Sequence, residues 1–381
     1  MPVRLALISG PAYDPLYERL RESPVPVEVG FRGDHPSLNR HFASFDAELP
    51  YDLVSTHTKY APSQERHLAA LDDLLSPALW SDFAPRVLTM ASVSGRKLGV
   101  PRNLDVRLLH YRTDLTSAPD TWDELFEICR HLQSTGRVRS AFVFPGMESG
   151  LFGTFYELCE MAGAELFPSD ARRPRIESDA GAWALGFLRK SVDEGLAPRA
   201  AKGWHYDAVH AYFRAGHAAF VGDWPGYYAF YRDPNACPVA AQIAVSAYPK
   251  GPAGKSLAYA GAHTFALTRA GAVRPEAVQV LELLTAVEPQ TFEAERGFVP
   301  VRRSVLSTLQ AHSHGAELAR FRTLEAVTRD AMLIPPQLPC YPEIEATIWQ
   351  HVQAAVFDGA DPDRTLREIA THIEHILQRG F

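Results

Sequence analysis

Apolar and polar residues near the start of the chain follow a pattern that predicts strands separated by helices. Short apolar runs predict strands at 3–9, 26–32 and 52–55. Apolar residues at three- and four-residue spacing predict helices at 13–23 and 63–75. Strands that alternate with helices in this way favour an α/β lobe with a largely parallel sheet.

The pattern changes between Lys97 and Leu115, where two short extended segments are expected around Pro101-Arg102-Asn103. A helix is expected next, because Thr121 is a good N-cap, Glu124 completes a capping box and Gly136 can end the helix. Further amphipathic helices are predicted over 153–167, 178–195, 206–216, 275–287 and 362–380. The later part of the chain is therefore predicted to be rich in helices.

Length and charge narrow the class of protein. At 381 residues and 42.2 kDa the chain is too long for one ordinary core, so two lobes are expected. A formal net charge of -7, with acids and bases interspersed, provides no basic stripe for phosphates, so no nucleic-acid partner is expected. No apolar run approaches the roughly 18 residues of a membrane span. The opening residues, MPVRLALISGPAYDPLYERL, lack the pattern of a signal peptide.

The cysteines suggest neither a redox motif nor a metal cluster. Cys129, Cys159, Cys237 and Cys340 are far apart and form no C-x-x-C pair. This spacing favours unpaired thiols, with one disulfide as the open alternative.

The segment GPAGKS, residues 251–256, resembles the end of a phosphate-binding loop. A Walker loop requires a glycine five residues before its final glycine, and Pro249 occupies that position. A helix should also follow the loop, whereas the sequence after it has the pattern of a strand. The segment is therefore expected to be a surface turn that leads into a strand.

The histidines invite a catalytic or metal-binding interpretation that their spacing does not support. His372 and His375 lack the H-E-x-x-H pattern, and His312 and His314 lack the accompanying carboxylates or cysteines of a zinc site. GMESG, at 146–150, does not match G-x-S-x-G. We therefore expect no enzyme activity, no metal and no cofactor.

Seven segments, taken in order, resemble family 1 extracellular solute-binding proteins, the maltose-binding-protein-like receptors of ABC importers. They are ALDDLLSP, GVPRNLDVRLLHYRTDL, APDTWDELFEICRHL, GDWPGYYAFY, YPKGPAGKSLAYAGAHTFAL, PEAVQVLELLTAVEPQ with RGFVPVRRSV, and the C-terminal stretch from IPPQLPCYPEI to HIEHIL. The resemblance implies a two-lobed α/β fold of the periplasmic-binding-protein type II, with a ligand cleft between lobes joined by crossing hinge strands. It implies one lobe from 1–108 plus 261–306 and another from 109–260 plus 307–381.

The resemblance also implies a function. The chain is expected to bind a carbohydrate or a similar polar solute, to close about its hinge, and to deliver the solute to ABC permease subunits as a monomer. A cytoplasmic ligand sensor or partner-binding protein on the same fold is the alternative, because no signal peptide is visible. The family implies a periplasmic or cell-surface location, and the alternative implies the cytoplasm.

Candidate ligand-binding residues are those that sugar recognition would require, namely polar groups for hydroxyls and aromatic rings for C–H faces. Strand ends supply one group, since open α/β sheets bind ligands there. Asp105 and Arg107 lie two apart on one face of an extended segment, where they could hold hydroxyls or form a hinge salt bridge. Trp224 could stack on the sugar or anchor the core. The full set is Gly10, Pro11, Ala12, Tyr13, His57, Lys59, Tyr60, Asp105, Arg107, Glu148, Phe152, Trp204, Trp224, Gly261, Ala262, His263, Arg302 and Tyr341.

The roles of two residues in this set, His263 and Arg302, are left open by the sequence. His263 stands where the family often has an aromatic residue, which weakens any transfer of sugar type. Arg302 follows GFVP and could equally be a solvated surface residue. For the residues at strand ends, the competing explanation is that they are polar only because they lie in loops, without a ligand role.

Overall fold

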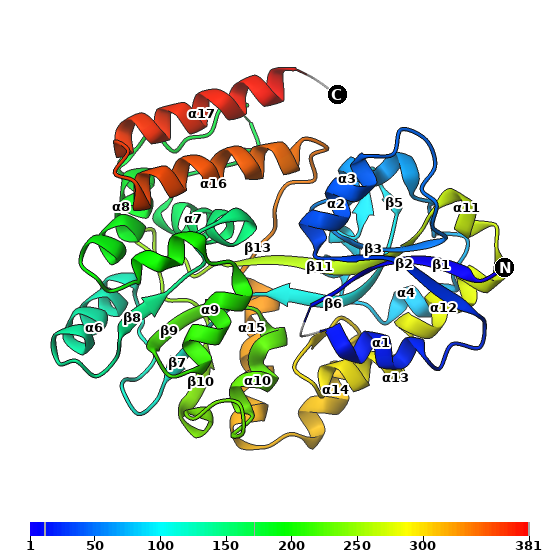
Figure 1. Ribbon diagram of the computed structural model, residues 1–381, viewed down its shortest axis with the longest axis horizontal. Helices are drawn as coiled ribbons and strands as arrows, with labels where there is room; N and C mark the ends of the chain where they lie inside the picture. The colour runs from blue at the N-terminus through cyan, green and yellow to red at the C-terminus, as the bar shows by residue number, and fades with distance from the viewer. Residues whose placement is uncertain (11–12, 171, 380–381) are drawn as a thin grey trace. The chain divides into compact units, whose positions relative to one another are not determined.

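The computed structural model describes residues 1–10, 13–170 and 172–379, so the predicted site residues Pro11 and Ala12 lie outside the described part. The chain divides into two compact units. Unit 1 comprises Met1–Asp105, Ala260–Phe321 and Ile334–Tyr341, and unit 2 comprises Val106–Tyr259, Arg322–Leu333 and Pro342–Phe381. These units place 307–321 and 334–341 with unit 1, whereas the sequence-based division placed them in the second lobe. Both units combine helices with a sheet, which confirms the α/β class (Figure 1).

Unit 1 is organised around a mixed sheet. Six of its seven strands are β1 (Val3–Ile8), β2 (Val27–Gly33), β3 (Leu53–His57), β6 (Val100–Val106), β11 (Ala258–Leu267) and β12 (Val299–Pro300), in the order β12-β6-β11-β3-β1-β2. The seventh, β13 (Met332–Leu333), pairs in parallel with the start of β11. β1 pairs in parallel with β2 and β3, as the sequence predicts, but β11 is antiparallel to β3 and β12 is antiparallel to β6. All ten residues of β11 are buried, so the strand shows no polar alternation from which its direction could be predicted.

One predicted helix of unit 1 is wrong. The helical pattern over 63–75 yields only α3 (Ala61–Gln64) and a 3₁₀ turn at Glu65–His67. Beyond that turn the backbone pairs with distant segments, because the Ala69 amide donates to the Leu267 carbonyl at 2.9 Å and the Leu71 amide donates to the Lys97 carbonyl at 2.8 Å. Tertiary hydrogen bonds therefore override the local periodicity.

The other helices of unit 1 surround this sheet. They are α1 (Asp14–Leu20), α2 (His35–Ala43), α4 (Pro77–Ser81), α5 (Pro85–Met90), α11 (Arg269–Ala272), α12 (Pro275–Thr285), α13 (Val287–Ala294) and α14 (Arg303–His312), with α15 (Gly315–Asp330) shared between the units. α2 positions part of the site, since it begins at His35 and is capped by the Asp34 carboxylate, which accepts from the Ser37 amide.

Unit 2 contains a smaller sheet, in the order β10 (Ile243–Ser246), β7 (Leu108–Arg112), β9 (Ala218–Asp223) and β8 (Ser140–Val143). Its helices include α6 (Trp122–Ser134), α7 (Glu148–Ala162), α8 (Asp179–Asp193), α9 (Tyr206–Arg214), α10 (Tyr228–Arg232), α16 (Tyr341–Phe357) and α17 (Pro362–Gln378). The red and orange helices in Figure 1, α17 and α16, run along one another. Their packing brings His351 Nε2 within 3.0 Å of His372 Nδ1.

The predicted N-cap of α6 at Thr121 is confirmed, and Glu124 reaches back to the Asp120 amide rather than to the Thr121 amide of a standard capping box. Thr121 accepts a hydrogen bond from the Glu124 amide at 3.1 Å, and Glu124 Oε2 accepts from the Asp120 amide at 2.7 Å. Thr121→Ala is expected to lower the free energy of unfolding by about 1 kcal/mol, since the helix loses a cap. Urea denaturation would measure this, with Ser117→Ala in the exposed loop before the helix as the control. Equal stabilities of the two variants would contradict the expected effect.

The GPAGKS segment is an exposed turn, as predicted. The Gly251 amide donates to the Lys255 carbonyl at 2.9 Å, and Gly254 has a φ of +73°, which favours glycine. Residues 252–255 are exposed, and β11 begins shortly afterwards.

The four cysteines are buried thiols. Burial raises the pKa of Cys129, Cys159 and Cys237. No helix among the described residues has the length and apolar character to cross a membrane.

Candidate functional site

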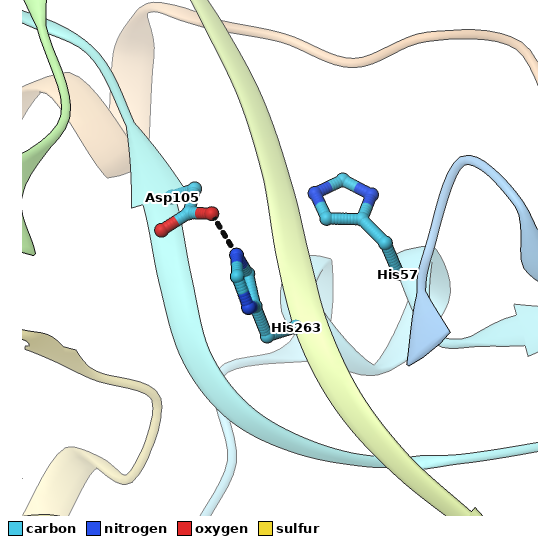
Figure 2. A group of neighbouring side chains, drawn as sticks. All are labelled: His57, Asp105 and His263. Carbon is cyan, nitrogen blue, oxygen red and sulfur yellow. Dashed lines mark ion pairs between the residues drawn. The ribbon is translucent and has the colours of Figure 1, made fainter. Parts of the chain in front are cut away.

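A histidine cluster lies where three strands of the unit 1 sheet meet. β3 ends at His57, and the antiparallel register places His263 of β11 directly opposite it. Asp105, near the end of β6, points to His263 (Figure 2). The sheet therefore brings together His57, Asp105 and His263, which are at least 48 positions apart in sequence. The sequence analysis selected each of the three as a site residue but did not predict that they meet.

The cluster is held by specific hydrogen bonds. His263 Nε2 pairs with Asp105 Oδ2, and His263 Nδ1 lies 2.9 Å from His35 Nε2. The Asn103 side-chain amide donates to Asp105 Oδ1 at 3.1 Å. His57 Nδ1 accepts from the Lys59 backbone amide at 3.2 Å. Neither His35 nor Asn103 was among the predicted site residues, because their proximity depends on long-range packing.

Burial sets the ionisation of two histidines of this cluster, His35 and His57. The side chains of His263 and Asp105 are only 5% and 16% exposed, and His35 and His57 are buried. Burial lowers the pKa of His35 and His57 well below the usual value, and the neighbouring His263 lowers both further. Both imidazoles are therefore neutral at neutral pH and keep a lone pair for hydrogen bonds.

Aromatic rings border the histidines in unit 1. The Tyr13 ring stacks at 5.7 Å from the His263 ring. The Lys59 ammonium lies 4.8 Å from the Tyr60 ring and 6.0 Å from the Tyr341 ring. Strand ends and loops therefore bring several predicted residues together, although Tyr60 and Tyr341 are buried.

Gly261 and Ala262 shape the backbone beside His57. A Cβ at Gly261 would lie 2.2 Å from His57 Cε1, so only glycine leaves room for that imidazole. The Ala262 amide donates to Thr58 Oγ1 at 3.1 Å, which ties β11 to the end of β3. Gly10 is exposed after β1 and has a φ of +147°.

A second group of predicted residues meets in unit 2. Trp224 is half-buried, and its ring lies 5.5 Å from the Tyr206 ring and 5.9 Å from the Tyr259 ring. The Arg107 guanidinium lies 5.5 Å from the same indole. Phe152 is fully buried 6.0 Å from Tyr259, where it supports this aromatic group from the core side.

Arg107 is fixed by a buried ion pair. Its guanidinium donates to Glu157 at 2.6 and 3.1 Å and to Thr154 at 3.1 Å, and the Tyr259 amide donates to Glu157 at 2.6 Å. Burial by itself would lower the pKa of Arg107, but the Glu157 carboxylate outweighs it and the pKa is raised. At Glu157 burial outweighs the Arg107 charge and the Tyr259 amide and raises the pKa to about 7, while the two guanidinium hydrogen bonds favour the carboxylate form. Glu157 was missed by the sequence analysis, although an acid among the apolar residues in the middle of α7 was the available signal.

Three predicted residues lie apart from these groups. Glu148 begins α7, where its carboxylate is 3.9 Å from His205 Nε2. Trp204 packs on Tyr212 at the margin of a hydrophobic core cluster. Arg302 is buried and donates to the Thr285 carbonyl at 2.8 and 3.1 Å, so the solvated alternative for this residue is wrong.

Solved structures with the same fold cover nearly the whole chain. A maltose-bound protein of T. maritima superposes with a TM-score of 0.88 at 22% identity, over 98% of this chain and 100% of the other. An ABC transporter solute-binding protein from Agrobacterium radiobacter, in complex with ribitol, superposes with a TM-score of 0.84 at 19% identity, over 99% and 98% of the two chains. These similarities confirm the two-lobed periplasmic-binding-protein-like fold.

Sequence comparison identifies the family. A protein of Deinococcus radiodurans, named as an ABC transporter-binding protein, is 25% identical over 236 residues, which is 59% of this chain and 56% of the relative. The match thus spans little more than half of the relative's length. The family model described as bacterial extracellular solute-binding protein matches residues 48–291, from before β3 to within α13. The chain therefore belongs to the family of bacterial extracellular solute-binding proteins.

Proposed function

We propose that this protein is the solute-binding receptor of an ABC importer and that its solute is a carbohydrate or a polyol. The observation that carries the proposal is the arrangement around Trp224 in unit 2, where a half-buried indole lies beside Tyr206, Tyr259 and the Arg107 guanidinium. Such rings suit the C–H faces of a sugar, and charged or amide groups suit its hydroxyls. Proteins of the same fold that hold maltose, ribitol and α-D-tagatose support this choice of solute.

Unit 1 by itself offers a further set of polar groups. Asp105, Lys59 and the histidines offer acceptors and donors at the ends of strands, the position where α/β sheets commonly present ligand groups. We infer that the solute is bound and released unchanged, without catalysis. Binding between the lobes with closure about the hinge remains a prediction from the family resemblance.

The proposed partners are the solute and the permease subunits of a transporter. The Deinococcus relative, named as an ABC transporter-binding protein, supports this pairing. The alternative of a cytoplasmic sensor on the same fold gains no support from these relatives.

Trp224→Ala is expected to abolish the rise in melting temperature that the cognate solute produces. A solute that binds the native state raises the melting temperature by mass action, and loss of the stacking surface removes that binding energy. Thermal denaturation against a panel of mono- and disaccharides, polyols, sugar phosphates and amino acids would measure it. Trp183→Ala, which removes a half-buried tryptophan from α8 of the same unit, is the matched control.

Each outcome of this screen is informative. A large shift for one sugar or polyol that survives in the Trp183→Ala variant and disappears in Trp224→Ala supports the proposal. A shift only for amino acids, or an equal shift in both variants, would overturn the assigned solute class or the role of Trp224, respectively.

A further inference from the structure

Three potential metal ligands converge in unit 1. His57 and His263 each offer an imidazole nitrogen and Asp105 offers a carboxylate oxygen, and these ligand atoms all lie within 4.8 Å of one another (Figure 2). We propose that His57, Asp105 and His263 form a binding site for one divalent transition-metal ion of the Zn²⁺ type. The proposed ion would use Asp105 and the histidines that the proposed function assigns to solute hydroxyls, so it adds a second ligand class at the same place in unit 1.

The ligand chemistry fits such an ion. Imidazole nitrogen and carboxylate oxygen are ordinary Zn²⁺ ligands at roughly 2.0–2.2 Å, and imidazole also suits Cu²⁺ and Ni²⁺. Two ligands on one ion can be at most about 4.2 Å apart at those bond lengths. Since the three atoms lie within 4.8 Å, small side-chain rotations would bring them onto one ion. Three protein ligands would leave a coordination position for water or for a solute oxygen.

Outer contacts already orient two of the ligands. Asn103 donates to Asp105 Oδ1, and Oδ2 now pairs with His263 Nε2, so an ion would take the place of the proton between those two atoms. His35 Nε2, at 2.9 Å from His263 Nδ1, can accept a hydrogen bond from the Nδ1–H group when His263 Nε2 coordinates. Metal-bound histidines are generally held by such a second partner, which fixes the tautomer. His35 and Asn103 therefore act as positioning residues.

His57 is expected to be the weakest ligand. Its Nδ1 accepts the Lys59 backbone amide at 3.2 Å, which places the proton of the neutral ring on Nε2. Coordination through Nε2 would move that proton to Nδ1 and remove the hydrogen bond. The Asp105 carboxylate contributes the negative charge that attracts the ion. The nearby positive charge of Lys59 lies over the Tyr60 ring, with the ammonium 4.8 Å from the ring centre.

The test is metal titration of the full chain after treatment with a chelator. Calorimetry with ZnCl₂, together with elemental analysis of the dialysed complex, is expected to show one ion per chain. Asp105→Asn and His263→Ala should abolish this binding, His57→Ala should weaken it less than either, and His35→Ala should weaken it about 10- to 100-fold. Circular dichroism of each metal-free variant shows whether that variant folds. Asn has nearly the same shape as Asp, so Asp105→Asn still tests the site if His263→Ala fails to fold.

His372→Ala is the matched control, because His372 and His351 form an exposed histidine pair in unit 2 that could bind Zn²⁺ adventitiously. The proposal holds if the His372→Ala variant binds like the wild type. Zn²⁺ binding that survives Asp105→Asn, or disappears in the His372→Ala variant, would overturn it, as would no binding at all. The rise in melting temperature with solute, measured in the presence of a chelator, tests the receptor function without metal. Failure of one proposal therefore leaves the other testable.

Discussion

Replacing Arg107 by alanine is expected to lower the free energy of unfolding by about 3–5 kcal/mol, because Glu157 would be left buried without its cationic partner. The two side chains are 1% and 2% exposed in unit 2. The Tyr259 amide would still donate to Glu157, but the two guanidinium hydrogen bonds would be lost. Urea denaturation followed by circular dichroism would measure the change.

A double variant shows how much of the destabilisation in Arg107→Ala comes from the unpaired acid and how much from lost side-chain packing. Arg107→Met with Glu157→Leu removes both charges and keeps apolar volume, so it should recover most of the stability lost in Arg107→Ala. Arg130→Ala is the control, since the Arg130–Glu194 pair is 45% and 35% exposed and should change stability by at most about 1 kcal/mol. A double variant no more stable than Arg107→Ala would mean that the ion pair itself holds the unit together.

The second large effect concerns Asp223 in unit 2. Its carboxylate accepts hydrogen bonds from the Trp224 amide at 2.8 Å and from the Tyr231 hydroxyl. Burial raises the pKa of Asp223 from 3.8 to about 7, even though these hydrogen bonds act in the opposite direction. The stabilisation from the buried protonated acid is therefore complete below about pH 4 and is lost as pH rises to about 7.

Asp223→Asn is expected to remove this loss. A shift of roughly three pKa units corresponds to about 4 kcal/mol, so the variant should gain up to that amount relative to the wild type between pH 4 and pH 8. The comparison between variants is needed because His210, 3.9 Å away, has its pKa lowered by burial to about 3 and favours the opposite pH trend. Denaturation curves measured at several pH values provide the readout.

The control for this prediction is an exposed acid. Asp170 pairs with Arg175 at 2.8 Å, and that hydrogen bond lowers its pKa, so Asp170→Asn should leave the dependence above pH 5 unchanged. A wild-type pH dependence that persists in Asp223→Asn would contradict the prediction and assign the dependence to other buried acids, such as Glu157, whose pKa burial raises to about 7.

Local signals predicted the elements of this fold that depend on local chemistry. The N-cap at Thr121 and the terminating Gly136 bracket α6, and the strong amphipathic pattern of α17 matches a helix over Pro362–Gln378. The helix predicted at 63–75 did not form, because the segment beyond His67 exchanges local hydrogen bonds for pairing with 267–268 and Lys97. Short-range periodicity cannot report such long-range pairing.

The site was only partly predictable for the same reason. Trp224, Arg107, His57, Asp105 and His263 were selected from strand ends and loop chemistry, but which of them meet is set by sheet register and packing. His35 and His263 are 228 residues apart in sequence, and no local pattern links them. A site residue whose position depends on a partner distant in sequence can therefore be identified only from the folded structure.

The burial of the native thiols makes the protein convenient for site-specific chemistry. Thiolates, rather than thiols, react with maleimides, and burial both shields the native sulfur atoms and raises the pKa of Cys129, Cys159 and Cys237. A cysteine introduced at Ala253, on the exposed 252–255 turn, would therefore be the preferred target for a dye. Fluorescence from that single point could follow solute and metal binding without removal of any native cysteine.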